Sequence, residues 1–169
     1  MKEPYQHYAE DFKPKKIKFL LIGESPPLTP EGQELRYFYN YKNNVGRNVL
    51  LSTISFVFIG RGFRKGNNKK EFLNKLCEKG VFLVDATYTP INKKNKKERR
   101  EIIKEDYPSL KKNILNLNLS SDTKFFLIHN NVVFAIGEML RNDFKQYEII
   151  SIGFPKYYDD RDFKEKIEK

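Results

Sequence analysis

Short apolar runs recur along the chain, and each of them ends in glycine or in polar residues. They cover residues 17–23, 81–87, 124–128 and 147–152. Uninterrupted apolar runs of this length are typical of parallel strands that are buried on both faces. The pattern therefore predicts four buried strands.

Between these runs, apolar residues recur at helical spacing. The stretches with this spacing are 48–58, 69–78, 101–107, 109–117, 132–141 and 160–167. Pro108 is expected to interrupt the third helix, because proline has no backbone N–H to donate. Strands that alternate with helices predict an α/β fold, a three-layer sandwich with helices on both faces of a central four-stranded parallel sheet.

The composition indicates one domain. The 169 residues show no shift in composition, so we expect a single domain over residues 1–169, preceded only by a polar arm, 1–16, that is irregular or briefly helical. This arm does not resemble a signal peptide, and no apolar run is long enough to cross a membrane, so we expect a cytoplasmic protein without a membrane partner. Cys77 is the only cysteine, which excludes an internal disulfide and a four-cysteine iron–sulfur cluster.

Chemically versatile residues follow the predicted strands. Glu24, Asp85, His129 and Lys156 each come at or just after the end of one run. The carboxyl ends of parallel strands meet at one edge of the sheet, where ligands bind in open α/β folds. We therefore expect an active site at this edge. Neither histidine has neighbours at metal-ligand spacing, so we expect no metal and no cofactor.

The loop after the first strand is rigid by composition. Pro26 and Pro27 prevent a helix from starting there, so Glu24 and Ser25 are held in an extended loop. This also argues against Ser25 as the nucleophile of a hydrolase, because a nucleophile elbow must lead directly into a helix.

The charge of the chain indicates a polyanionic partner. The formal net charge is +10 at pH 7, and a dense basic run, 93–100, follows the second strand. Basic surfaces gain affinity for DNA by releasing counterions from phosphates. The alternatives are that the lysines reflect an AT-rich coding bias and that the basic run is a solvated face.

Several segments, taken in order, resemble the motifs of one known family. They are Gly23-Glu24-Ser25-Pro26-Pro27, Tyr37-Phe38-Tyr39-Asn40, Gly80-Val81-Phe82-Leu83-Val84-Asp85 and Gly153-Phe154-Pro155. Together they span about 17–163 and resemble the uracil-DNA glycosylase superfamily. The chain departs from the family pattern at two positions: Phe154 stands where relatives carry the histidine of a His-Pro-Ser motif, and Asp85 stands where relatives have an asparagine.

The resemblance implies a DNA glycosylase-like protein of base-excision DNA repair. Such a hydrolase flips a damaged or modified base out of single- or double-stranded DNA and hydrolyses its N-glycosidic bond; the two departures leave uracil unassured as the substrate. A carboxylate suits this reaction because the sugar develops positive charge. We expect catalytic roles for Glu24 and His129. The residues expected to bind the base are Ser25, Pro26, Phe38, Tyr39, Asp85 and Asn130. The residues expected to contact DNA are Lys93, Lys94, Phe154, Lys156 and Arg161.

Alternatives remain open for several of these residues. An ionised Asp85 only accepts hydrogen bonds and would favour a base with an amino group, such as a cytosine derivative; otherwise it caps a turn or pairs with a lysine. His129 is either a catalyst or a structural hydrogen-bonding residue, and the rings of 37–39 either stack on a base or cover the core. At the level of the whole chain, the alternative is a non-catalytic module that binds DNA or a modified nucleotide. In either case we expect a monomer.

Overall fold

A parallel sheet forms the centre of the structure. In this computed structural model, which describes residues 4–42, 48–155 and 161–168, the sheet has four strands in the order β2-β1-β3-β4. The strands are β1 (Ile17–Gly23), β2 (Val81–Asp85), β3 (Leu119–Leu127) and β4 (Glu148–Ser151). Every neighbouring pair runs parallel. The predicted central sheet is confirmed, although β3 begins five residues earlier than its apolar run.

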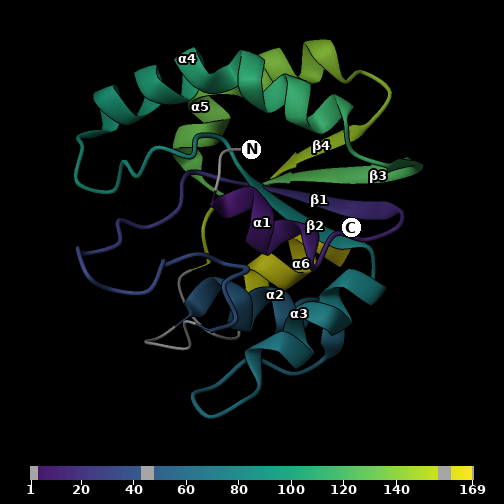
Figure 1. Cartoon of the computed structure of the whole chain (residues 1–169). Helices are drawn as coiled ribbons and strands as arrows, with labels where there is room; N and C mark the ends of the chain where they lie inside the picture. Colours follow the sequence, from purple (N-terminus) through teal and green to yellow (C-terminus); the bar gives the residue numbers. More distant parts are fainter. Residues whose placement is uncertain (1–3, 43–47, 156–160, 169) are drawn as a thin grey trace.

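Helices cover both faces of this sheet. They are α1 (Tyr5–Glu10), α2 (Val49–Ile59), α3 (Lys69–Glu78), α4 (Lys96–Leu115), α5 (Asn130–Asp143) and α6 (Arg161–Glu168). Figure 1 shows α4 and α5 on one face and α2, α3 and α6 on the other, which confirms the predicted three layers. None of the helices in the described part of the chain is long and apolar enough to cross a membrane.

Asparagine side chains fix the start of three helices. Asn48 accepts a hydrogen bond from the backbone of α2, and Asn68 does the same for α3. At the start of α4, Asn95 and Glu98 form a reciprocal capping box, in which each side chain binds the other residue's backbone N–H. Such caps satisfy N–H groups that would otherwise lack a partner. The start of helix α4, the helix that follows β2 in the chain, is therefore fixed at a defined residue.

The prediction that Pro108 interrupts a helix is wrong. Helix α4 runs unbroken for 20 residues from Lys96 to Leu115, with Pro108 inside it. The proline is exposed, whereas Ile103, Leu110 and Ile114 are buried on the face toward the sheet. Burial of several large apolar side chains offsets the roughly 3 kcal/mol that an interior proline costs. The basic run 93–100 consequently ends in the first turns of this helix.

The amino-terminal arm packs onto the domain through one helix. Its only described helix, α1, buries Tyr5 and Ala9, and Phe12 just beyond it is also buried. The ring of Tyr5 contacts those of Tyr37 and Tyr88 at centroid distances of 5.0 and 5.4 Å. The prediction of a briefly helical arm is confirmed, and Tyr5 and Phe12 of this arm belong to the core.

The chain leaves neighbouring strands toward opposite faces of the sheet. After β1 it continues into α2 on one face, and after β3 it continues into α5 on the other (Figure 1). Because β1 and β3 are neighbours, the two connections diverge between their carboxyl ends. This divergence is the topological switch point at which ligands bind in open α/β sheets.

Candidate active site

Glu24 lies at the switch point, directly after β1. Its side chain is only 11% exposed. Asn131, at the start of α5, donates from its side-chain amide to Oε1 of Glu24 at 2.6 Å. Arg99, in the first turn of α4, donates from Nη1 to Oε2 at 3.1 Å. The carboxylate is thus oriented by one donor from each of the two helices on that face of the sheet.

Arg99 also holds the loop that precedes its own helix. Its guanidinium donates to the backbone carbonyl of Asn92 at 2.5 Å and to that of Lys94 at 2.9 Å. These contacts fix the guanidinium while it pairs with Glu24. The ion pair therefore joins the tip of β1 to the connection between β2 and α4.

His129 caps the start of helix α5 and lies close to the carboxylate of Glu24. Its Nδ1 accepts a hydrogen bond from the backbone N–H of Asn131 at 3.2 Å, so the neutral ring carries its proton on Nε2. That Nε2 lies 3.6 Å from Oε2 of Glu24, beyond direct hydrogen-bonding distance. Burial lowers the pKa of His129, the negative charge of Glu24 opposes the change, and Arg99 lowers it further. The neutral ring therefore points an N–H at Glu24.

Asp85 ends β2 beside Glu24. It is buried, and burial together with the negative charge of Glu24 raises its pKa from 3.8 to about 7. Gly23 is its partner across the strands, where an added Cβ would lie 2.5 Å from Oδ1 of Asp85. Only glycine leaves room for the carboxyl at this position.

The pKa of Asp85 changes the hypothesis made for this residue. Below pH 7 the carboxyl is largely protonated, so it both donates and accepts a hydrogen bond, as an asparagine would. No lysine and no backbone N–H in the described part of the chain hydrogen-bonds its side chain, so neither structural alternative is observed there.

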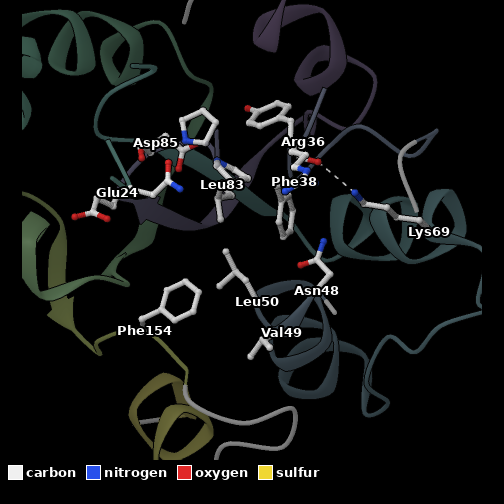
Figure 2. A pocket seen from close by; sticks show the side chains of 15 residues that line it. Glu24, Arg36, Phe38, Asn48, Val49, Leu50, Lys69, Leu83, Asp85 and Phe154 are labelled. Atoms are coloured by element: carbon white, nitrogen blue, oxygen red, sulfur yellow. Dashed lines mark hydrogen bonds between the residues drawn. The ribbon is translucent and has the colours of Figure 1, made fainter. Parts of the chain in front are cut away.

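A cavity of about 630 Å³ opens next to the two carboxyl groups (Figure 2). Glu24 and Asp85 lie together at one end of it. Phe38 and Phe154 point toward its interior from different sides, and Leu50 of α2 lies between them in the view. The cavity thus combines an acidic end with apolar walls.

The aromatic loop contributes to this cavity unequally. Phe38 is half-buried and lines it, whereas Tyr39 is buried and lies outside its lining. The hydroxyl of Tyr39 accepts a hydrogen bond from the backbone N–H of Leu83 at 2.6 Å, and its ring stacks on Phe12 and Phe82. Tyr39 therefore belongs to the core, whereas Phe38 is placed to stack on a ligand.

Lys69 of α3 supports the aromatic loop from beneath. Its buried Nζ donates to the backbone carbonyls of Tyr37 at 3.2 Å and Asn40 at 2.9 Å. Burial lowers the pKa of Lys69 to about 8. Figure 2 shows this side chain reaching the loop from the helix below it. Its position at the start of a lysine-rich helix gives no sign of this role in the sequence.

The other predicted site residues fall into separate groups. Ser25 and Pro26 line the cavity next to Glu24. Asn130 and Lys94 line a second cavity on the far side of Glu24, together with His129. Lys93 is exposed on the surface. Lys156 lies outside the described residues, and Arg161 is described only as the first residue of α6.

Two residues that bind Glu24 directly were not predicted as site residues. Arg99 is one of several basic residues in the run 93–100, and Asn131 directly follows Asn130, the predicted site residue. Nothing in the sequence separates Arg99 from the other basic residues of this run, because its contact with Glu24 joins residues that lie 75 positions apart.

Comparisons of the chain with protein-family models, with curated protein sequences and with solved structures found no match. Among residues 4–42, 48–155 and 161–168, no three histidine, cysteine, aspartate or glutamate side chains lie together as a metal site would need.

Proposed function

We propose that this chain is a DNA glycosylase-like protein that hydrolyses the N-glycosidic bond of a damaged or modified base. The observation that carries the proposal is the pair of carboxyl groups, Glu24 and Asp85, at one end of an apolar cavity at the switch point. The resemblance of residues 23–27 to the uracil-DNA glycosylase superfamily supports it. We propose further that the chain acts on DNA as a monomer.

The cavity suits one flipped nucleotide. Its volume of about 630 Å³ lies within the range of small-molecule sites, roughly 300–1,000 Å³. Phe38 offers a ring for stacking, and Asp85 offers hydrogen bonds to the edge of the base. A base must leave the helical stack to reach such a site, and aromatic walls repay part of that cost.

Glu24 is suited to stabilise the sugar. As the bond from C1′ to the base breaks, its electron pair leaves with the base and the sugar becomes positively charged. The oxygen of a water molecule then bonds to C1′ and that water gives up one proton, while the departing base gains one, so the step takes up no net proton. Each oxygen of Glu24 keeps a free lone pair after binding Asn131 and Arg99, so the carboxylate still accepts a hydrogen bond from that water. Asp85, with its pKa of about 7, can carry the proton that the base needs.

The test is an alkali-cleavage assay for abasic sites. Oligonucleotides with uracil, hypoxanthine, xanthine or a modified cytosine are incubated, single- and double-stranded, with the wild type and with Glu24→Gln. We expect at least one base to be released and Glu24→Gln to slow its release about 100-fold or more, because the charge is lost while the shape is kept. The matched control is Glu101→Gln, an exposed glutamate of α4, which should leave the rate unchanged. Equal rates for the wild type and Glu24→Gln would contradict the assigned role.

One observation favours a second function, a non-catalytic module that binds DNA or a modified nucleotide. Both oxygens of Glu24 already have partners, as in a structural ion pair. Such a module would bind the same oligonucleotides, with an affinity that falls as salt rises, and would release no base from any of them.

A further inference from the structure

A second cavity lies behind the Glu24–Arg99 ion pair. Its volume is about 610 Å³, and its walls come from the start of α4 and the start of α5. Lys94, Lys96, Arg99 and Arg100 line it, and within the described part of the chain no acidic residue does. The cavity therefore favours an anionic ligand.

An exposed aromatic ring forms part of the same cavity. Phe134 of α5 is 67% exposed, more than any other large apolar side chain that the structure describes. The guanidinium of Arg100 lies over this ring, 4.5 Å from its centroid. Arg100 in turn donates from Nε to Oδ1 of Asn131 at 3.2 Å, which holds it in place. The ring is thus presented to solvent on a helix, with a fixed cation on one face.

This combination fits one nucleotide of a single strand. Bases of single-stranded DNA stack on exposed aromatic rings, and cations near the ring bind the phosphates of the same strand. In a duplex the base faces are covered, so a ring on the protein surface has nothing to stack on. The surrounding charge also disfavours an apolar protein partner, which would need a larger apolar patch than one ring.

We propose that the second cavity binds one nucleotide of single-stranded DNA, with its base on Phe134 and its phosphate against Lys94 and Lys96. The cavity shares a wall with the first one, because Glu24 lines the first cavity and its partners Arg99 and Asn131 line the second. A DNA strand that places one nucleotide in the first cavity could then bind a nearby nucleotide in the second cavity. This link between the cavities rests on the proposed function, whereas binding at Phe134 does not.

The first experiment tests the stacking. Fluorescence anisotropy of a 5′-fluorescein single-stranded 12-mer with ordinary bases is measured for the wild type, Phe134→Tyr and Phe134→Leu. Phe134→Leu keeps an apolar side chain but loses the ring, so we expect binding to weaken about tenfold, whereas Phe134→Tyr should bind like the wild type. The control Leu115→Ala removes another exposed apolar side chain, 64% exposed at the other end of α4, and should have no effect. Circular dichroism checks that each variant is folded.

The second experiment tests the phosphate contacts. The double variant Lys94→Gln/Lys96→Gln is compared with Lys79→Gln/Lys145→Gln, which removes the same charge from exposed lysines outside the cavity. Each phosphate contact that is lost should lower the slope of log affinity against log salt by about 0.7 on a single strand. Because Lys94 and Lys96 hold the phosphate of one nucleotide, we expect a slope reduced by about 0.7 for the cavity variant and by much less for the control.

The outcomes separate this site from the proposed function. Binding by Phe134→Leu equal to that of the wild type would overturn the site, even if the wild type releases a base. An equal effect of Phe134→Leu on a strand made of abasic residues would also overturn it, because no base is then stacked. If Phe134 matters only for self-association in size-exclusion chromatography, the surface is a protein contact and the proposal fails. A Phe134 effect without any base release would refute the glycosylase alone.

Discussion

The pKa of the buried Asp85 carboxyl depends on the residues next to it. It has Gly23 directly across the strands and Glu24 beside it, and its pKa is raised from 3.8 to about 7 by burial and by that second negative charge. Two carboxyl groups with different environments are the usual way in which an active site separates an acid from a base. In this site Glu24 has a cation as its partner and Asp85 has none among the described residues.

The raised pKa of Asp85 predicts how stability depends on pH. Because the folded-state pKa lies above the unfolded-state value, the folded protein binds more protons than the unfolded chain between about pH 4 and pH 7. The contribution of the protonated Asp85 carboxyl to stability is fully present below that window and is lost as pH rises through it. Asp85→Asn removes the titration, so its free energy of unfolding relative to the wild type should rise by about 2–4 kcal/mol between pH 4.5 and pH 8.

Urea unfolding at the two pH values measures this difference. The control is Asp11→Asn, an exposed aspartate after α1, which should show the same pH dependence as the wild type. A pH profile of Asp85→Asn that parallels the wild type would mean that the carboxyl is ionised in the folded protein throughout this range.

At the scale of elements, α4 carries a proline against its own propensity. Pro108 cannot donate to the carbonyl of Lys104, and its side chain is exposed, so it contributes little packing. We expect Pro108→Ala to raise the free energy of unfolding by about 1–3 kcal/mol, measured by urea denaturation. The neighbouring exposed Ser109→Ala should change it by about 0.5 kcal/mol or less. A destabilising Pro108→Ala would show that the proline supports a bend on which the helix depends.

The elements were predictable because their apolar patterns are strong. The runs at 17–23 and 81–85 have no polar interruption except Lys18, and a buried strand was the one structure that fitted them. Helix α4 was predicted as two pieces, because a local rule for proline does not include the burial of Ile103 and Ile114 on either side of it. Local propensity and tertiary packing disagree there, and packing prevails.

The site was predictable only in part, because residues that contact one another there lie far apart in the sequence. Glu24 and Asp85 could be named because parallel strands end at one edge. Their partners could not, since Arg99 lies 75 residues and Asn131 lies 107 residues from Glu24 in sequence. The loop of Tyr39 has no periodicity, so nothing in the sequence shows which of its rings faces the core.

At the scale of the whole molecule, the first residues of the chain support the loop that lines the first cavity. Phe12 is 1% exposed and stacks on Tyr39 at a centroid distance of 6.0 Å. Tyr39 in turn binds the backbone of Leu83 in β2. The arm, the loop after β1 and the edge strand β2 are therefore one packed unit.

Shortening Phe12 should loosen this unit. We expect Phe12→Ala to lower the free energy of unfolding by about 3–5 kcal/mol, because a buried ring is lost and a cavity remains. Thermal unfolding followed by circular dichroism measures it, with the exposed His7→Ala in the same arm as the control. A loss below about 1 kcal/mol would mean that the arm is dispensable for the fold.

The order of the strands in the sheet also determines when each strand can pair with its neighbours during synthesis. The central strand β1 is complete at residue 23, but its second neighbour β3 ends only at residue 127, about a hundred residues later. At roughly 5–20 residues per second, an apolar strand waits on the order of 5–20 seconds for that partner. Synthesis of this chain therefore includes an interval in which one edge of β1 has no strand beside it, and chaperones that bind nascent strands can act during this interval.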